Sequence, residues 1–125
     1  MVYFFLSAML FARVVGRLGE AEMLIDFLKK AVATGCDSIE IEYKDGKEWI
    51  TGYWDRVGYG IGHLSHDEAK PMFKEMDDLK KKREVTIGGI RYRLAFSRFE
   101  SFGEWVYRIR IRQTDRTGAA GQRRH

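Results

Sequence analysis

The chain has 125 residues, 45% of them hydrophobic and 14% aromatic, which is enough apolar side chain for one domain with a core and excludes an intrinsically disordered protein. It holds 22 basic and 18 acidic residues, but half of its net charge of +4 comes from the tail, where Arg116, Arg123 and Arg124 outnumber Asp115. The nearly neutral remainder disfavours a typical basic nucleic-acid-binding protein. Because Cys36 is the single cysteine, an internal disulfide is excluded, and we expect a cytoplasmic protein.

An apolar run opens the chain at Val2–Ala12. It is about half as long as the roughly 20 residues that a membrane-spanning helix needs. Its positive charges, Arg13 and Arg17, follow it rather than precede it as in a secretory signal. We expect a buried or partner-covered helix, with peripheral membrane contact as the alternative. Residues 1–22 are therefore predicted to be an apolar N-terminal extension. Its first 16 or so residues are predicted to be separable from the fold, and Met23 is an alternative natural start.

A first helix is predicted from Met23, because apolar side chains recur at helical spacing as far as Val32. Gly35 is predicted to end it. The segment Ser38–Tyr43 then alternates apolar and polar residues, the period of a strand with one face in water. A hairpin turn, KDGK, and two aromatic-rich strand-like segments follow, the last ending near Leu64.

A second helix is predicted after Ser65, but its start is ambiguous in the sequence. The SHDE motif has the spacing of a capping box, which marks the start of a helix. Pro71 lies a few residues later, and proline inside a helix removes a backbone hydrogen bond. We therefore expect a short turn over Ser65–Lys70 and the main helix from Pro71 to about Lys82.

Two further strands are predicted to close the domain as a hairpin with the four-residue loop Glu100–Gly103, preceded by a turn or bulge at Ile87–Gly89. The fold class is α+β over residues 23–112: helix, three strands, helix and two-stranded hairpin, with a mostly antiparallel sheet and the helices packed on one face. Residues 113–125 lack large apolar side chains and are predicted to be a disordered tail. The predicted core comprises Phe27, Leu28, Val32, Ile39, Ile41, Phe73, Met76, Leu94, Phe96, Ile109 and Ile111.

Arginines alternate with apolar residues along both strands of this hairpin. The predicted loop places Leu94 opposite Ile109 on an apolar face and Arg93 opposite Arg110 on the other face. Like charges directly opposite destabilise a sheet, so the arginines need acidic partners. An external acidic protein surface is one source, and the candidate partner-binding residues are Arg91, Arg93, Arg108, Arg110 and Arg112. Internal glutamates on neighbouring strands are the other source: Glu40, Glu42 or Glu48.

Three short motifs are candidates for chemical sites. The glycine-rich Gly58–Gly62 lacks the lysine ending of a phosphate-binding loop and fits a twisted strand better. His63 and His66 precede two acidic residues, but no third separated ligand cluster accompanies them. Cys36 follows a glycine that is predicted to end a helix and comes at the start of a buried strand, which favours a small buried thiol over a catalytic nucleophile. We therefore expect no catalytic residue, metal or cofactor, and keep a small enzyme using Gly58–His66 as a minority alternative.

The segment Met23–Lys47 resembles the opening of the N-terminal domain that precedes the motor domain in type II secretion and type IV pilus-assembly ATPases. That family has a helix of similar apolar spacing and then a segment close to GASDIHIEP. The matching residues are Gly35, Ile39, Ile41 and Glu42. The later order of elements is also similar, with a Gly103–Glu104 pair before the last strand, so the resemblance extends to about Arg112.

The departures from that family narrow what the resemblance implies. Cys36, Asp37, Ser38, Glu40 and Tyr43 differ from the family segment, and the sequence has no Walker A lysine loop. The resemblance therefore implies a bacterial adaptor-like domain that does not hydrolyse ATP and that binds a secretion or pilus-type ATPase or another assembly component. A single-stranded nucleic-acid-binding domain, using arginines and aromatic residues on a sheet face, is the alternative.

Overall fold

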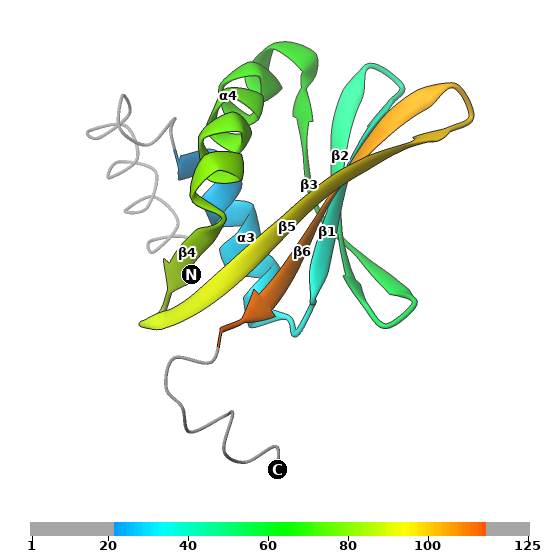
Figure 1. Cartoon of the computed structure of the whole chain (residues 1–125). Helices are drawn as coiled ribbons and strands as arrows, with labels where there is room; N and C mark the ends of the chain where they lie inside the picture. The colour runs from blue at the N-terminus through cyan, green and yellow to red at the C-terminus, as the bar shows by residue number, and fades with distance from the viewer. Residues whose placement is uncertain (1–21, 115–125) are drawn as a thin grey trace, which may run out of the picture.

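A computed structural model describes residues 22–114, in which two helices and six strands make an α+β fold (Figure 1). The predicted fold class is confirmed, although the structure has one more strand than the sequence analysis predicted. The predictions of an apolar extension over 1–22 and a disordered tail over 113–125 fall almost entirely outside the described residues. The elements are α3 (Met23–Ala33), β1 (Ser38–Lys44), β2 (Lys47–Trp54), β3 (Val57–Ser65), α4 (His66–Lys82), β4 (Glu84–Ile87), β5 (Ile90–Ser101) and β6 (Glu104–Gln113).

The six strands form one antiparallel sheet in the order β3-β2-β1-β6-β5-β4. The strands before α4 form one three-stranded meander and those after it form another, and pairing of β1 with β6 joins the two. The additional strand, β4, has only four residues, too few to show an alternating pattern in the sequence. It turns into β5 through Gly88 and Gly89, both with positive φ, so the predicted turn or bulge at this point is a two-residue hairpin turn.

The predicted register of the β5–β6 hairpin is wrong by two residues. Ser101 pairs with Glu104, and the connection is a two-residue turn, Phe102–Gly103, in which both residues have positive φ. Such a turn matches the right-handed twist of the strands better than a wider loop does. Leu94 consequently lies opposite Ile111, not Ile109. A shift of two residues keeps every side chain on its predicted face, because strand side chains alternate with a period of two.

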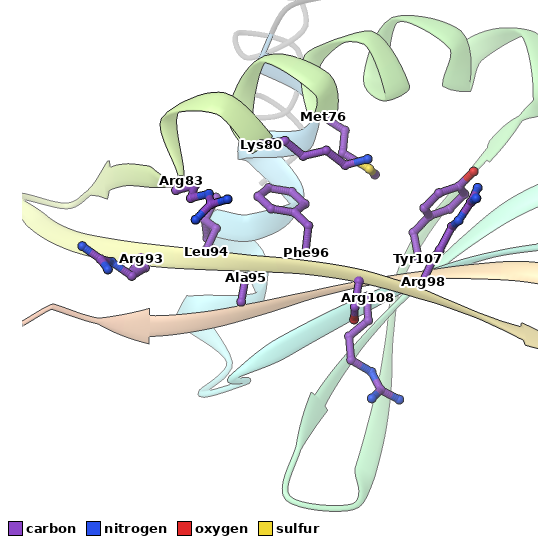
Figure 2. Close-up of a pocket in the computed structure, with 11 residues that line it drawn as sticks. Met76, Lys80, Arg83, Arg93, Leu94, Ala95, Phe96, Arg98, Tyr107 and Arg108 are labelled. Atoms are coloured by element: carbon purple, nitrogen blue, oxygen red, sulfur yellow. The ribbon is translucent and has the colours of Figure 1, made fainter.

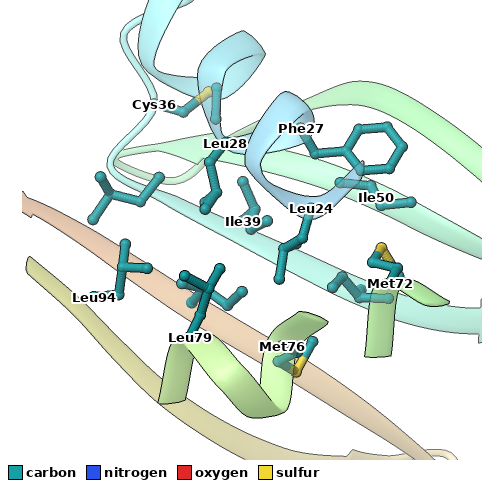
Figure 3. Packing of buried hydrophobic residues seen from close by; sticks show 14 of the residues in the cluster. Leu24, Phe27, Leu28, Cys36, Ile39, Ile50, Met72, Met76, Leu79 and Leu94 are labelled. Atoms are coloured by element: carbon teal, nitrogen blue, oxygen red, sulfur yellow. The ribbon is translucent and has the colours of Figure 1, made fainter. Parts of the chain in front are cut away.

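Both helices pack on one face of the sheet and enclose the core, which Figure 3 shows at close range. The predicted core is confirmed: eight of its eleven members are buried, and Val32, Phe73 and Phe96 are partly buried against them. Leu24, Leu28, Ile39, Ile41, Ile50, Met72, Leu94 and Ile109 are essentially inaccessible to solvent.

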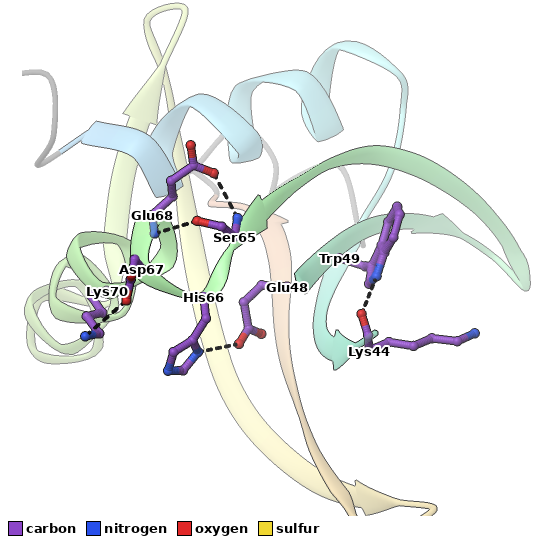
Figure 4. A network of polar contacts seen from close by, with 8 residues as sticks. All are labelled: Lys44, Glu48, Trp49, Ser65, His66, Asp67, Glu68 and Lys70. Atoms are coloured by element: carbon purple, nitrogen blue, oxygen red, sulfur yellow. Dashed lines mark hydrogen bonds and ion pairs between the residues drawn. The ribbon is translucent and has the colours of Figure 1, made fainter. Parts of the chain in front are cut away.

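The helix α4 is continuous from His66, so the prediction of a separate turn before Pro71 is wrong. The capping box forms in full: the Glu68 N–H donates to Ser65 Oγ at 3.1 Å, and the Ser65 N–H donates to Glu68 Oε1 at 2.8 Å (Figure 4). Pro71 removes only the bond that its N–H would have donated to the carbonyl of Asp67, an exposed residue. The cap stabilises the first turn, and one lost bond does not interrupt the helix.

A buried carboxylate from α4 caps the first turn of α3. Glu75 accepts a hydrogen bond from the Leu24 N–H at 2.7 Å and another from the Ile25 N–H at 3.1 Å, one to each carboxylate oxygen. The side chain of Glu22, at the usual capping position, makes no such bond. Burial raises the pKa of Glu75 to about 7, although the two N–H groups oppose the rise. Glu75 thus joins the two helices through a group that titrates near neutral pH.

Candidate partner-binding surface

The face of the sheet opposite the helices carries the predicted arginines. We call this surface, on β1, β2, β5 and β6, the helix-free face. The register fixes its membership, because Ile39 and Ile109 pair within the core and their chain neighbours therefore point the other way. Its main side chains are Glu40, Glu42, Trp49, Thr51, Tyr53, Arg91, Arg93, Ala95, Ser97, Phe99, Val106, Arg108, Arg110 and Arg112.

Arg108 is the best-held arginine of the helix-free face. Its Nε and Nη2 donate to Oε2 of Glu40 at 3.0 and 2.7 Å, and its guanidinium lies 4.7 Å from the centre of the Phe99 ring. Glu40 lies directly across from Arg108 in the β1–β6 ladder, so the backbone register brings the charges together. Internal pairing with a glutamate of a neighbouring strand is therefore confirmed for Glu40.

The other two glutamates named as internal partners behave differently. Glu48 is buried and points to the helix-covered side, where its Oε2 lies 3.8 Å from Nδ1 of His66 (Figure 4). It shares that side with Ile50, two residues along β2, so it cannot reach the arginines. Burial raises the pKa of Glu48 while His66 opposes the rise. Glu42 lies on the helix-free face but makes no ion pair among residues 22–114.

The remaining arginines are more exposed. Arg93 approaches Glu84 of β4 at 3.5 Å and lies directly opposite Arg112. Within the described residues Arg91, Arg110 and Arg112 make no ion pair. Three guanidinium groups on this face are thus left to solvent or to a partner. The structure also places all five predicted arginines on one face, as expected from their alternation.

A groove of about 820 Å³ lies at the end of the helix-free face where β6 finishes. Arg110 and Arg112 line it together with Tyr53 and Arg56 from the β2–β3 hairpin. Asp37, Glu40 and Asp55 also contribute, so the groove is mixed in charge, with arginines in excess. The arrangement suits recognition of carboxylates by planar guanidinium groups, which bind them through two hydrogen bonds.

Aromatic side chains on the helix-free face are largely engaged by neighbours. Trp49 donates its Nε1 hydrogen to the carbonyl of Lys44 at 2.9 Å and packs 4.9 Å from His63 (Figure 4). Phe99 is covered by Arg108, as described above. Stacking on a nucleic-acid base needs an open ring face. Trp49 nevertheless remains 37% exposed, so part of its ring is open to solvent.

The structure places the glycine, histidine and cysteine motifs of the sequence as follows. Gly62 in β3 faces the core, where a Cβ atom would come within 2.9 Å of Phe27, and Gly52 leaves room for the buried thiol of Cys36. His63 packs on Trp49 from β3, while His66 begins α4. Over residues 22–114 no cluster of three metal-ligating side chains is found. Gly52 and Gly62 therefore allow core side chains to pack closely against their strands.

A second groove was missed by the sequence analysis. It has a volume of about 600 Å³ and lies between the end of α4 and β5, lined in part by Lys80, Arg83 and Arg98 (Figure 2). The sequence shows a run of basic residues at the end of α4, and the helix dipole is sufficient to explain it. Only the fold shows that Lys80 and Arg83 of this run line the same groove as Arg98.

No known family model matches this chain, and no curated protein does. None of the helices among residues 22–114 is long and apolar enough to cross a bilayer.

Proposed function

We propose that this domain is a non-catalytic interaction and regulatory module that binds an acidic protein surface through its helix-free face. The observation that carries the proposal is the presence of three exposed arginines, Arg91, Arg110 and Arg112, on a sheet face that no helix of the described residues covers. Arg108 is fixed beside them by Glu40. Complementary charge speeds association and selects among partners.

The class of partner rests on the sequence resemblance. The resemblance to the N-terminal domains of secretion and pilus-assembly ATPases favours a partner in such a system, either the ATPase or another assembly component. It also implies a cytoplasmic location. Of the matching residues, Ile39 and Ile41 lie in the core, where they would support a similar fold, whereas Glu42 lies on the helix-free face. Specificity for the partner depends on this surface.

The test compares two variants that lose the same charge. Arg110→Gln/Arg112→Gln removes two arginines from the helix-free face, and Lys29→Gln/Lys74→Gln removes two exposed lysines from the helices. Tagged proteins are used to recover partners from bacterial extract, and recovered proteins are quantified by mass spectrometry. The proposal expects a set of acidic proteins that the arginine variant loses and the lysine variant retains. Equal recovery by both variants and the parent would contradict it.

Single-stranded nucleic acid is the alternative ligand, favoured by the presence of Tyr53 and Trp49 on the same face as the arginines. Titration of a fluorescent oligouridine and a fluorescent oligothymidine at several salt concentrations decides between the two. Phosphate contacts make log affinity fall steeply with log salt. Binding of either probe with such a slope, lost in the arginine variant, would replace the protein partner with nucleic acid.

A further inference from the structure

The strand β5 has an open edge over its second half. β4 pairs only with Ile90–Arg93, and the last bond on that side runs from the Leu94 N–H to the Arg83 carbonyl at 2.9 Å. From Ala95 to Ser101 the described residues supply a neighbour on the other side alone, where β6 pairs with every residue. Figure 1 shows this half of the hairpin reaching past the end of β4. This second half of β5 is therefore an edge strand, and it lies next to the helix α4.

The orientation of the free backbone groups follows from the ladder. In an antiparallel strand both polar groups of a residue point to the same side, and the side alternates along the chain. The Leu94 N–H points away from β6, so the polar groups of Phe96, Arg98 and Glu100 point the same way. The pairing with β6 runs without interruption from Tyr92 to Ser101, so no bulge changes this alternation. Three N–H and three C=O groups therefore line the open edge.

The groove beside this edge combines an apolar floor with a basic rim. Met76, Phe96 and Tyr107 contribute the apolar part. Figure 2 shows Lys80 reaching from α4 towards β5 and Arg98 on the same side of the strand, with Arg108 on the opposite side. No acidic side chain of residues 22–114 lines this groove, although Asp77 lines a smaller adjoining hollow with Lys80 and Arg98. A space of about 600 Å³ lies within the range of ligand pockets.

The basic rim has no internal partners among residues 22–114. Lys80, Arg83 and Arg98 make no ion pair there, in contrast to Arg93 and Arg108, which do. The Arg98 guanidinium lies 4.3 Å from the centre of the Trp105 ring, and this cation–π contact positions the side chain. Arg98 is exposed, so its guanidinium can bind a carboxylate through charge-assisted hydrogen bonds.

The charge selects the occupant. Proteins commonly guard open edges with charged side chains. A second copy of this chain paired symmetrically about Arg98 would bring the same cations together, which disfavours that arrangement. An acidic strand would instead meet Lys80 and Arg98 with opposite charge. Strand addition supplies main-chain hydrogen bonds, and pockets for alternate side chains supply specificity. Both parts are present at this edge.

We propose that the open edge of β5, from Ala95 to Ser101, binds an extended acidic peptide of a protein partner as a seventh strand. Its carboxylates point to the helix-covered side of the sheet, where they face Lys80, Arg83 and Arg98, and its alternate side chains point to the other side, next to Ala95 and Ser97. The proposal rests on the proposed function in that the partner is a protein, but it uses the open edge of β5 and not Arg91, Arg110 and Arg112.

The probe is the hexapeptide Val-Glu-Val-Glu-Val-Glu, blocked at both ends, titrated into the full chain. Its controls are the same sequence with lysine in place of glutamate, and the acidic sequence with its valine nitrogens or its glutamate nitrogens methylated. Methylation removes strand hydrogen bonds and leaves the charge unchanged. We expect the acidic peptide to bind and the lysine peptide not to bind. At least one of the two methylated acidic peptides should also lose binding, because the nitrogens that donate to β5 are then blocked.

Amide hydrogen exchange locates the site. The N–H groups of Phe96, Arg98 and Glu100 should become protected by the acidic peptide, while those of Ser97 and Phe99, already bonded to β6, should change little. In Lys80→Gln/Arg98→Gln the affinity should fall by about tenfold or more. The matched control Lys81→Gln/Lys82→Gln removes two charges from the same helix end, outside the groove, and should bind as the parent does.

Different outcomes separate this inference from the proposed function. Protection that appears around Arg110 and Arg112, or binding that is equal for both methylated peptides and the unmethylated one, would overturn strand addition and leave the helix-free face as the protein-binding surface. Recovery of partners that depends on Lys80 and Arg98 but not on Arg110 and Arg112 would support the edge and overturn the helix-free face. A dimer joined through β5, detected by sedimentation, would also overturn the peptide proposal.

Discussion

The two faces of the β5–β6 hairpin are built from alternate residues of the same strands, yet they differ in what stabilises them. On the covered face Leu94, Ile109 and Ile111 are buried beneath the helices. On the helix-free face Arg110 and Arg112 are exposed. The burial of apolar area stabilises the first, whereas exposed charges contribute little to the stability of the second. The comparison indicates that the covered face maintains the fold and leaves the arginines available for binding.

The largest expected difference in stability between the two faces comes from creating a cavity beneath the helices. Leu94→Ala removes a side chain that is 2% exposed and should lower the free energy of unfolding by about 2–5 kcal/mol. The control Ser97→Ala, on the other face of the same strand, should change it by less than about 0.5 kcal/mol. Urea denaturation measures both. Similar values for the two variants would show that the faces do not differ as described.

A second difference is that the covered side contains an ionisable group that responds to pH. The pKa of Glu75 is about 7 in the folded protein and about 4.5 in the unfolded chain, so the folded state binds more protons between these values. The contribution of Glu75 to stability should therefore be greatest below about pH 4.5, fall as the pH rises to 7, and level off above pH 7. The free energy of unfolding should decrease over this range by at most about 3 kcal/mol.

The variant Glu75→Gln isolates this effect. It keeps an oxygen acceptor near the Leu24 N–H but cannot ionise. Its stability should lack the decline between pH 4.5 and 7 that the parent shows when both are unfolded by urea at a series of pH values. A decline of the same size in the variant would assign the pH dependence to other groups.

The helix-free face should respond to salt instead. Glu40→Gln breaks the pair with Arg108, which is only partly buried, and should cost about 1 kcal/mol at low salt and less at high salt. Glu42→Gln is the matched control, since Glu42 lies two residues along the same strand and makes no ion pair among residues 22–114. Unfolding is measured at two salt concentrations. An equal effect of both substitutions would show that the ion pair adds nothing.

The smallest expected effect tests the register. Arg112 lies opposite Arg93, whereas Arg110 lies opposite Ala95. Arg112→Thr should therefore relieve like-charge repulsion and leave the protein as stable as the parent or more stable by some tenths of a kcal/mol. Arg110→Thr should bring no such relief. The four-residue loop expected from the sequence would give relief for both substitutions, since it places Arg110 opposite Arg93 and Arg112 opposite Arg91.

Local periodicity predicted the faces of the sheet but not its pairing. The alternation around Leu94 and Ile109 was enough to assign both to the core, because a wrong register by two residues leaves the faces intact. The register itself depends on the turn, and an aromatic residue such as Phe102 at a φ of 52° is not a usual turn signal. The start of α4 was missed because Pro71 was given more weight than the capping box.

The candidate surfaces show the same limit. Which side the arginines occupy followed from the sequence, and so did the general expectation of a glutamate partner. That the partner is Glu40, and that Glu48 is buried on the far side, required the pairing of β1 with β6, distant in the sequence. The groove beside Lys80 and Arg98 likewise joins a helix end to a strand edge. Contacts of this kind leave no periodic pattern in a sequence.

The sheet order has a consequence for the sequence of events during synthesis. The last strand, β6, lies in the middle of the sheet and is the element that joins β1 to β5. Until β6 has emerged from the ribosome, β1 retains an unpaired edge and the two halves share no strand pairing. We expect the domain to acquire its stability late and in one step, and a nascent chain stopped before Glu104 to depend on chaperones to avoid aggregation.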